Sequence, residues 1–152
     1  MELVINSKNM CAGLSAKHKE EVIKILSDKF FSSGLVTKDF YDHVIKREEV
    51  FPTGLPTVIP VALCHTDPEF VIKNALGVAT LKEAVKFQEM GSPENTLDVQ
   101  IVFLLALKES KDQIFWLMNI VEVFKDKNAL EQILYASSEE GLEQNIKKLF
   151  KI

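Results

Sequence analysis

Apolar residues recur at helical spacing in the first third of the chain. This pattern predicts a helix over residues 16–33, ended by Gly34, and a second helix that Thr37 caps and that ends near residues 47–50. Pro52 supports the second end, because a proline moves the residue before it out of the α-helical conformation. Two helices are therefore expected before the middle of the chain.

The same spacing returns in the last third of the chain. Ser110 and Gln113 form a capping-box pattern ahead of an amphipathic helix, and a short helix is expected around residues 129–136. Ser137 and Glu140 form a second capping box, which predicts the start of a last helix. Three helices are thus expected after the middle of the chain.

Strand patterns occupy the middle of the chain. The run at residues 61–64 is too short for a helix and apolar on both faces, which is typical of a central strand. An isolated Gly77 indicates a bulge or a close backbone approach, and residues 89–95 are expected to form a polar loop. The predicted strands cover residues 3–5, 61–64, 74–81, 84–89 and 97–107. Without a repeat or a linker, this order predicts one domain over residues 1–152, an α/β fold with a mixed β-sheet flanked by helices.

The composition excludes several classes of protein. With 152 residues, 47% of them hydrophobic, the chain is long enough for one sizeable core. The net charge of −4 argues against nucleic-acid binding. The two cysteines lie far apart, no basic leader is seen, and the longest apolar run, residues 101–107, is too short to cross a bilayer. We expect a soluble cytoplasmic protein without direct membrane insertion.

Candidate chemistry concentrates in residues 47–68. This stretch contains the only arginine, Arg47, four of the five prolines and one of the three histidines, His65. His65 directly follows the predicted central strand, and ligands of open α/β sheets bind at the carboxyl ends of strands. Arginine binds phosphate through a planar fork that lysine lacks, so the pair suggests phosphoryl chemistry. The plainer alternatives are a structural histidine at a strand end and a surface ion pair of Arg47 with Glu48 or Glu49.

Two other kinds of site compete with this interpretation. Cys64 beside His65 suggests a thiolate–imidazole pair, but neighbouring side chains of a strand point to opposite faces, which favours a core position for Cys64. A metal site would need His65 and Asp67 to converge with His43 or Cys64, and no second ligand pair follows in the sequence. Neither of the common glycine-rich phosphate loops occurs. A phosphoryl group would therefore arrive already activated on a partner.

Together these motifs resemble a known family. The letters RE at residues 47–48, FPTG at residues 51–54 and a short apolar strand ending at His65 resemble the RE…PTG…PH pattern of the phosphotransferase-system enzyme IIA family of the fructose–mannitol type. The ExFPTG form at residues 49–54 and the segment at residues 105–117 look most like its galactitol-type branch. The resemblance in element order covers nearly the whole chain.

The resemblance implies a phosphoryl carrier that needs no metal or other cofactor. His65 would accept a phosphoryl group from the phosphohistidine of the carrier protein HPr and pass it to a cysteine of enzyme IIB. That enzyme works with the membrane enzyme IIC to take up and phosphorylate a sugar or polyol. Arg47 would support the phosphorylated state, together with backbone N–H groups around Thr53 and Gly54.

Two positions depart from the family pattern. Cys64 stands where the family usually has proline, and Gln113 stands in the region of a second active-site histidine of mannitol-type members. Gln113 is therefore either a further support for the phosphoryl group or only a helix cap. Two other functions stay open: a non-catalytic regulatory module of the same fold that binds phosphorylated partners or small anions, and a thiol or metal hydrolase using Cys64, His65 and Asp67.

Overall fold

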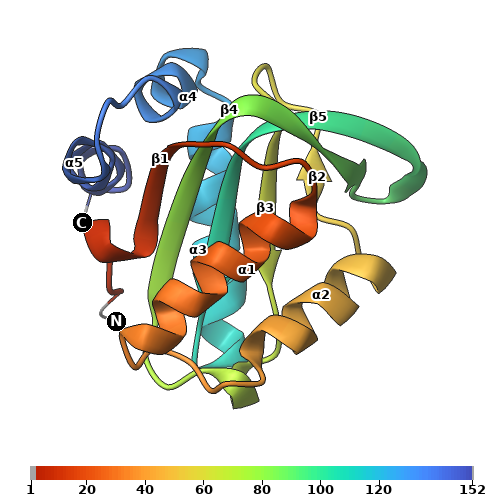
Figure 1. Cartoon of the computed structure of the whole chain (residues 1–152), viewed down its shortest axis with the longest axis vertical. Coiled ribbons are helices and arrows are strands. Elements are labelled where there is room, and N and C mark those ends of the chain that lie inside the picture. Colours follow the sequence, from red (N-terminus) through yellow and green to blue (C-terminus); the bar gives the residue numbers. More distant parts are fainter. Residues whose placement is uncertain (1–2, 152) are drawn as a thin grey trace.

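In the computed structural model, which describes residues 3–151, a long antiparallel hairpin forms the centre of one β-sheet (Figure 1). β4 (Ala75–Glu89) pairs with β5 (Ser92–Ala106), with Val78 opposite Phe103. Gly91 turns the chain between them at φ 78°, a conformation that favours glycine. The hairpin extends beyond the helices at one side of the molecule.

The other strands extend the sheet on both sides of this hairpin. β1 (Met10–Leu14) runs parallel to β4, and β3 (Val61–His65) runs parallel to β5. β2 (Gly54–Leu55) pairs antiparallel with β3 and also meets the end of β4, where Gly54 lies opposite Glu89. The sheet is therefore mixed, and β3 lies well inside it.

Helices cover both faces of the sheet (Figure 1). Among residues 3–151 the α-helices are α1 (Lys19–Ser32), α2 (Phe40–Val50), α3 (Ser110–Phe124), α4 (Lys127–Leu134) and α5 (Glu139–Leu149). Core residues of α1 and α2 pack with Cys64 on one face, whereas core residues of α3, α4 and α5 pack with Leu63 on the other. Two short 3-10 helices, η1 (Ser7–Asn9) and η2 (Pro68–Phe70), complete the order of elements.

The predicted fold class is confirmed: the chain forms a single α/β domain with a five-stranded mixed sheet flanked by helices. The close approach expected at Gly77 is also found, because a Cβ there would lie 2.9 Å from both the Asn9 carbonyl oxygen and the Phe30 ring. Within residues 3–151, none of the helices combines the length and the apolar character needed to cross a bilayer.

Several strand predictions are wrong. The predicted edge strand at residues 3–5 makes only an isolated bridge from Val4 to Ala75, and the edge strand is β1. The two strands predicted over 74–81 and 84–89 are one continuous strand. The loop expected at 89–95 is largely strand, because the hairpin turns at Met90 and Gly91 and then runs in a solvent-exposed part of the sheet that tolerates polar residues.

The helices exist where they were predicted, but their starts differ. α1 begins at Lys19 with His18 as N-cap, and Asp39, not Thr37, precedes α2. α3 follows Glu109, and Ser138 caps α5 by accepting a hydrogen bond from the Gly141 amide. The capping boxes predicted from Ser110 and Ser137 are therefore wrong, since each true N-cap lies one residue away.

Candidate functional site

His65 is the last residue of β3 and is half-buried. Its ring nitrogen Nδ1 lies 3.0 Å from the Leu63 carbonyl oxygen. A carbonyl oxygen can only accept, so this hydrogen bond places the ring proton on Nδ1 and leaves the lone pair on Nε2. The strand end thus presents one defined nitrogen, Nε2, with a free lone pair.

The surroundings of His65 keep its ring neutral. Burial lowers the pKa of His65 below its ordinary value of 6.5, and the positive charge of Arg47 lowers it further. The Leu63 carbonyl and the Asp67 carboxylate act in the opposite direction but do not cancel the effect. Only the neutral imidazole has a free lone pair, which is the form that a nucleophilic histidine requires.

Arg47 projects from the last turn of α2 toward the segment that follows His65. Its Nη1 lies 3.6 Å from Oδ1 of Asp67, and its guanidinium lies over the Phe51 ring at 5.3 Å. Its Nε is buried and finds no hydrogen-bond acceptor among residues 3–151. The arginine therefore retains a donor that an incoming anion would satisfy.

Glu48 is a buried residue of the candidate site that the sequence did not reveal. It was considered only as a surface partner of Arg47, which is wrong, because Glu48 is 2% exposed and Arg47 pairs with Asp67. The Thr53 amide donates to Oε2 of Glu48 at 2.9 Å, and the Thr53 hydroxyl donates to Oε1 at 2.7 Å. Burial raises the pKa of Glu48, and the Thr53 hydrogen bonds oppose the rise. An acid between Arg47 and Glu49 on an amphipathic helix gave no signal of this burial.

Thr53 and Gly54 organise the site by their backbone. The Thr53 amide is taken up by Glu48, so it does not point to a free anion site. A Cβ on Gly54 would lie 2.6 Å from the Gln88 carbonyl oxygen, and the Gly54 carbonyl accepts a hydrogen bond from the Met90 amide at 2.8 Å. Gly54 is therefore a strand residue that lets the tip of the β4–β5 hairpin approach β2.

Gln113 lies against the segment after His65. Its Nε2 donates to the Thr66 carbonyl oxygen at 3.0 Å, and it takes no part in capping α3. The structure thus answers one alternative from the sequence: Gln113 is no helix cap. It links α3 to the backbone beside the histidine, a position that only the family resemblance had indicated.

Cys64 faces away from His65, as the alternation of a strand predicts. It is fully buried in the core on the α1 and α2 side, with its Sγ 3.8 Å from Oγ1 of Thr53. Burial, and then the nearby Glu48 carboxylate, raise the pKa of Cys64 well above its ordinary value. A buried thiol that resists ionisation is a poor nucleophile, which counts against the thiol hydrolase alternative.

Within the described part of the chain, no three His, Cys, Asp or Glu side chains converge as metal ligands would. The residues of the hydrolase alternative do not come together, because Cys64 points into the core on one face of the sheet, whereas His65 lines the groove with Leu63 on the other. Asp67 instead faces Arg47.

An apolar groove of about 750 Å³ opens beside His65. It is formed by Leu55 of β2, Met90 at the hairpin tip, and Phe115 and Met118 on α3. Phe115 is 57% exposed and Met118 is 68% exposed, which is unusual for large apolar side chains so close together. The histidine therefore lies at the edge of a surface suited to contact with another protein.

Curated relatives resemble this chain in sequence at moderate identity. The mannitol-specific phosphotransferase enzyme IIA component of Bacillus subtilis is 27% identical over 142 residues, which cover 91% of this chain and 93% of that protein. The transcriptional regulator ManR of the same organism is 33% identical over 93 residues, 61% of this chain. The chain spans only 13% of the length of ManR.

Solved structures show the same fold. The crystal structure of IIA mannitol from Escherichia coli superimposes with a TM-score of 0.76 at 20% identity and covers 99% of both chains. A complex of enzyme IIA mannitol with phosphorylated enzyme IIB mannitol from Escherichia coli gives the same TM-score at 18% identity, again with 99% coverage of both chains.

The family model for EIIA 2 of the phosphoenolpyruvate-dependent sugar phosphotransferase system matches residues 4–149. Enzyme IIA components are phosphotransferases that carry a phosphoryl group on a histidine, which agrees with the neutral His65 beside Arg47. The match spans nearly all of the described residues, so the chain belongs to the EIIA 2 family of the sugar phosphotransferase system.

Proposed function

We propose that this protein accepts a phosphoryl group from phospho-HPr on Nε2 of His65 and passes it to a cysteine of enzyme IIB. The observation that carries the proposal is the position of His65, whose Nδ1 is bonded to Leu63 and whose ring is neutral beside Arg47. Both transfers take place in the cytoplasm. Enzyme IIB then uses the phosphoryl group to phosphorylate the sugar or polyol that the membrane enzyme IIC takes up.

The transfer proceeds in two displacements. In the first, the Nε2 lone pair of His65 forms a bond to phosphorus while the phosphorus–nitrogen bond on HPr breaks, and that electron pair returns to the HPr imidazole. In the second, a cysteine thiolate of enzyme IIB attacks phosphorus and the bond to Nε2 breaks. The proton stays on Nδ1 throughout, donated in a hydrogen bond to the Leu63 carbonyl oxygen, so the ring leaves as a neutral imidazole.

Arg47 is the principal electrostatic support in this proposal. The phosphoryl group brings on the order of −1.5 to −2 charges, by analogy with other phosphorylated side chains. The buried, unpaired Nε of Arg47 supplies a donor that is already in place, so little reorganisation is needed when the charge arrives.

Gln113, Thr53 and Gly54 support the phosphoryl group indirectly. Gln113 holds the backbone at Thr66, one residue after His65. Thr53 and Gly54 hold β2 between the buried Glu48 and the tip of the β4–β5 hairpin. In this arrangement they fix the shape around the histidine.

The apolar groove beside His65 is the proposed contact surface for HPr and enzyme IIB. Both partners must bring a reactive atom to the same Nε2, so their contact surfaces must overlap, and the groove is the exposed apolar surface that His65 shares. A relative in the complex with phosphorylated enzyme IIB has the same fold. The transported substrate is proposed to be a sugar or polyol: the sequence resemblance favours galactitol, whereas the names of the relatives indicate mannitol.

A second candidate function is a regulatory module that keeps this fold and responds to phosphorylated partners. It is favoured by the 33% identity to part of the transcriptional regulator ManR. Such a module would take up a phosphoryl group without passing it to enzyme IIB, so the second displacement separates the two candidates.

The test is incubation with phosphoenolpyruvate labelled in its phosphoryl group, enzyme I and HPr, followed by addition of enzyme IIB. We expect an acid-labile label on the protein that chases onto enzyme IIB, and no label on His65→Ala. His18→Asn is the matched control, because His18 is exposed at the start of α1 and asparagine also serves as an N-cap. Label that persists in His65→Ala would contradict the proposal, and label that never leaves for enzyme IIB would favour the regulatory module.

A further inference from the structure

We infer that Asp67 is a positioning residue that sets how firmly the site retains a phosphoryl group. Its carboxylate engages Arg47 and places a negative charge beside His65, and both effects favour onward transfer. The inference rests on the proposed function, because it concerns the phosphorylated form of His65.

The orientation of Asp67 is not explained by its own turn. Asp67 occupies the N-cap position of η2, where an aspartate side chain ordinarily accepts a hydrogen bond from the backbone of the turn. It makes no such bond. Its Oδ1 instead lies 3.6 Å from Nη1 of Arg47, although the carboxylate is 65% exposed and has solvent available.

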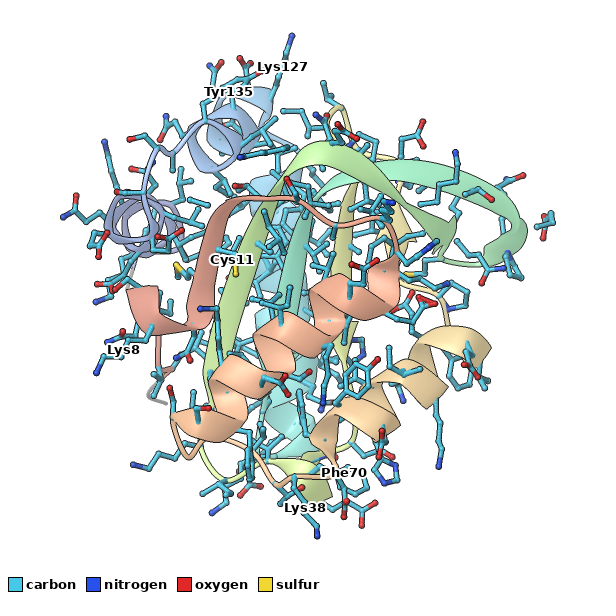
Figure 2. The ribbon with its side chains drawn as sticks, in the orientation of Figure 1. Lys8, Cys11, Lys38, Phe70, Lys127 and Tyr135 are labelled. Carbon is cyan, nitrogen blue, oxygen red and sulfur yellow. The ribbon has the colours of Figure 1, made fainter. Side chains whose placement is uncertain are left out.

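Contacts on both sides fix the segment that carries Asp67. Gln113 donates to the Thr66 carbonyl at 3.0 Å from the α3 side. From the α2 side, the His43 ring stacks on Phe70 with centroids 3.7 Å apart, and Figure 2 shows Phe70 near Lys38, beside the start of α2. Asp67 therefore cannot leave Arg47 by a movement of the segment without breaking contacts to two helices.

The two charges act on the histidine in opposite directions. Arg47 lowers the pKa of His65 and Asp67 raises it, so the ring senses both groups. When Nε2 carries a phosphoryl group, the two residues exchange their effects: Arg47 attracts the negative charge of this group, and Asp67 repels it.

The guanidinium divides its donors between these two anions. Nη1 faces Asp67, whereas Nε is buried and unpaired, so the phosphoryl group would share the arginine with a competing carboxylate. A carrier must release what it binds, and a fixed competitor lowers the stability of the loaded state without weakening the geometry of attack.

The test compares Asp67→Asn with the wild-type protein in equilibrium with HPr and phospho-HPr. Asparagine keeps the size of the side chain and removes its charge. We expect the ratio of phosphorylated to free protein to rise about three- to tenfold, the scale of one charge–charge interaction near a protein surface. Asp67→Glu should stay closer to wild type, since it restores the carboxylate. Glu69→Gln is the matched control, because Glu69 is an exposed acid of the same segment for which no ion pair with Arg47 is found in residues 3–151.

The outcomes separate this inference from the proposed function. An unchanged or lower ratio in Asp67→Asn, with wild-type protein still labelled on His65, overturns the inference alone. An equal rise in Glu69→Gln also overturns it, because the effect would then be one of general charge. Wild-type protein that takes no label on His65 from competent partners overturns the proposed function and the inference together.

Discussion

Glu48 and Thr53 are joined by two hydrogen bonds across the end of α2, so that a buried carboxylate holds both the amide and the hydroxyl of the segment leading to β2. Arg47 is the residue directly before Glu48, and Cys64, directly before His65, touches Thr53. The arginine and the histidine therefore sit on two backbone segments that meet at one buried contact. This contact links the position of Arg47 to that of His65.

Replacement of Glu48 should show that its hydrogen bonds matter more than its charge. Glu48→Gln can accept from the Thr53 amide through its carbonyl oxygen and donate to the Thr53 hydroxyl, so we expect a change in the free energy of unfolding within about 1 kcal/mol. Glu48→Ala leaves the Thr53 amide without a partner and opens a cavity, and should cost about 2–4 kcal/mol. Urea denaturation of both variants measures the difference. Equal losses in both would contradict the role of the hydrogen bonds.

The pH dependence of stability has a definite sign at the same residue. The folded state raises the pKa of Glu48 above its ordinary 4.5, so the native protein binds the proton more tightly than the unfolded chain. The contribution of the protonated Glu48 to the free energy of unfolding is therefore fully present below pH 4.5. It is lost as the pH rises through the pKa of Glu48 in the folded state. The difference in unfolding free energy between the wild type and Glu48→Gln should shift against the wild type over this range. A difference that stays constant with pH would show that the carboxyl group does not titrate differently on folding.

Much of the site followed from the sequence because it depends on local patterns. A short apolar run placed His65 at the end of a central strand, and the alternation of strand side chains placed Cys64 in the core. The features that the sequence did not predict depend on contacts between segments that are distant in the chain. The segment of β1 has no alternating pattern, and Glu48 looks solvent-exposed on its helix until α2 is packed against β3.

Gly54 offers a test of the packing between β2 and the β4–β5 hairpin. In Gly54→Ala the new methyl group would meet the Gln88 carbonyl oxygen at 2.6 Å, and a backbone oxygen cannot step aside as a flexible side chain does. We expect a loss of about 2–4 kcal/mol in unfolding free energy, together with slower phosphoryl transfer. Gly91→Asn is the matched control at the hairpin tip, because nothing lies within 4 Å of that position and asparagine tolerates positive φ. A stable, fully active Gly54→Ala would contradict the assigned close approach.

Arg47→Lys tests whether the planar fork of the arginine is needed beyond its charge. Lysine retains a cation but lacks the Nε donor that is buried beside the site, so we expect phosphoryl transfer to slow about 10- to 100-fold. The measurement is rapid-quench transfer from phospho-HPr, with circular dichroism to verify the fold. Lys46→Gln serves as the control, because Lys46 is exposed and lies one residue away on the same helix. If Arg47→Lys transfers at the wild-type rate, the planar fork and its Nε donor are not needed beyond the positive charge.

The titration of His65 connects the geometry of the site with its activity. Burial is the largest cause that lowers the pKa of His65, and Arg47 adds to it, so the midpoint measured by NMR should lie below 6.5. In the proposed function the neutral ring is the acceptor, so the rate of phosphoryl acceptance should stay constant above this pKa and fall as the pH drops through it. Removing the positive charge in Arg47→Gln should raise the midpoint, and removing the negative charge in Asp67→Asn should lower it, because the two groups act on the ring in opposite directions. Shifts of the same sign in both variants would show that the mutations act through a change in burial and not through their charges.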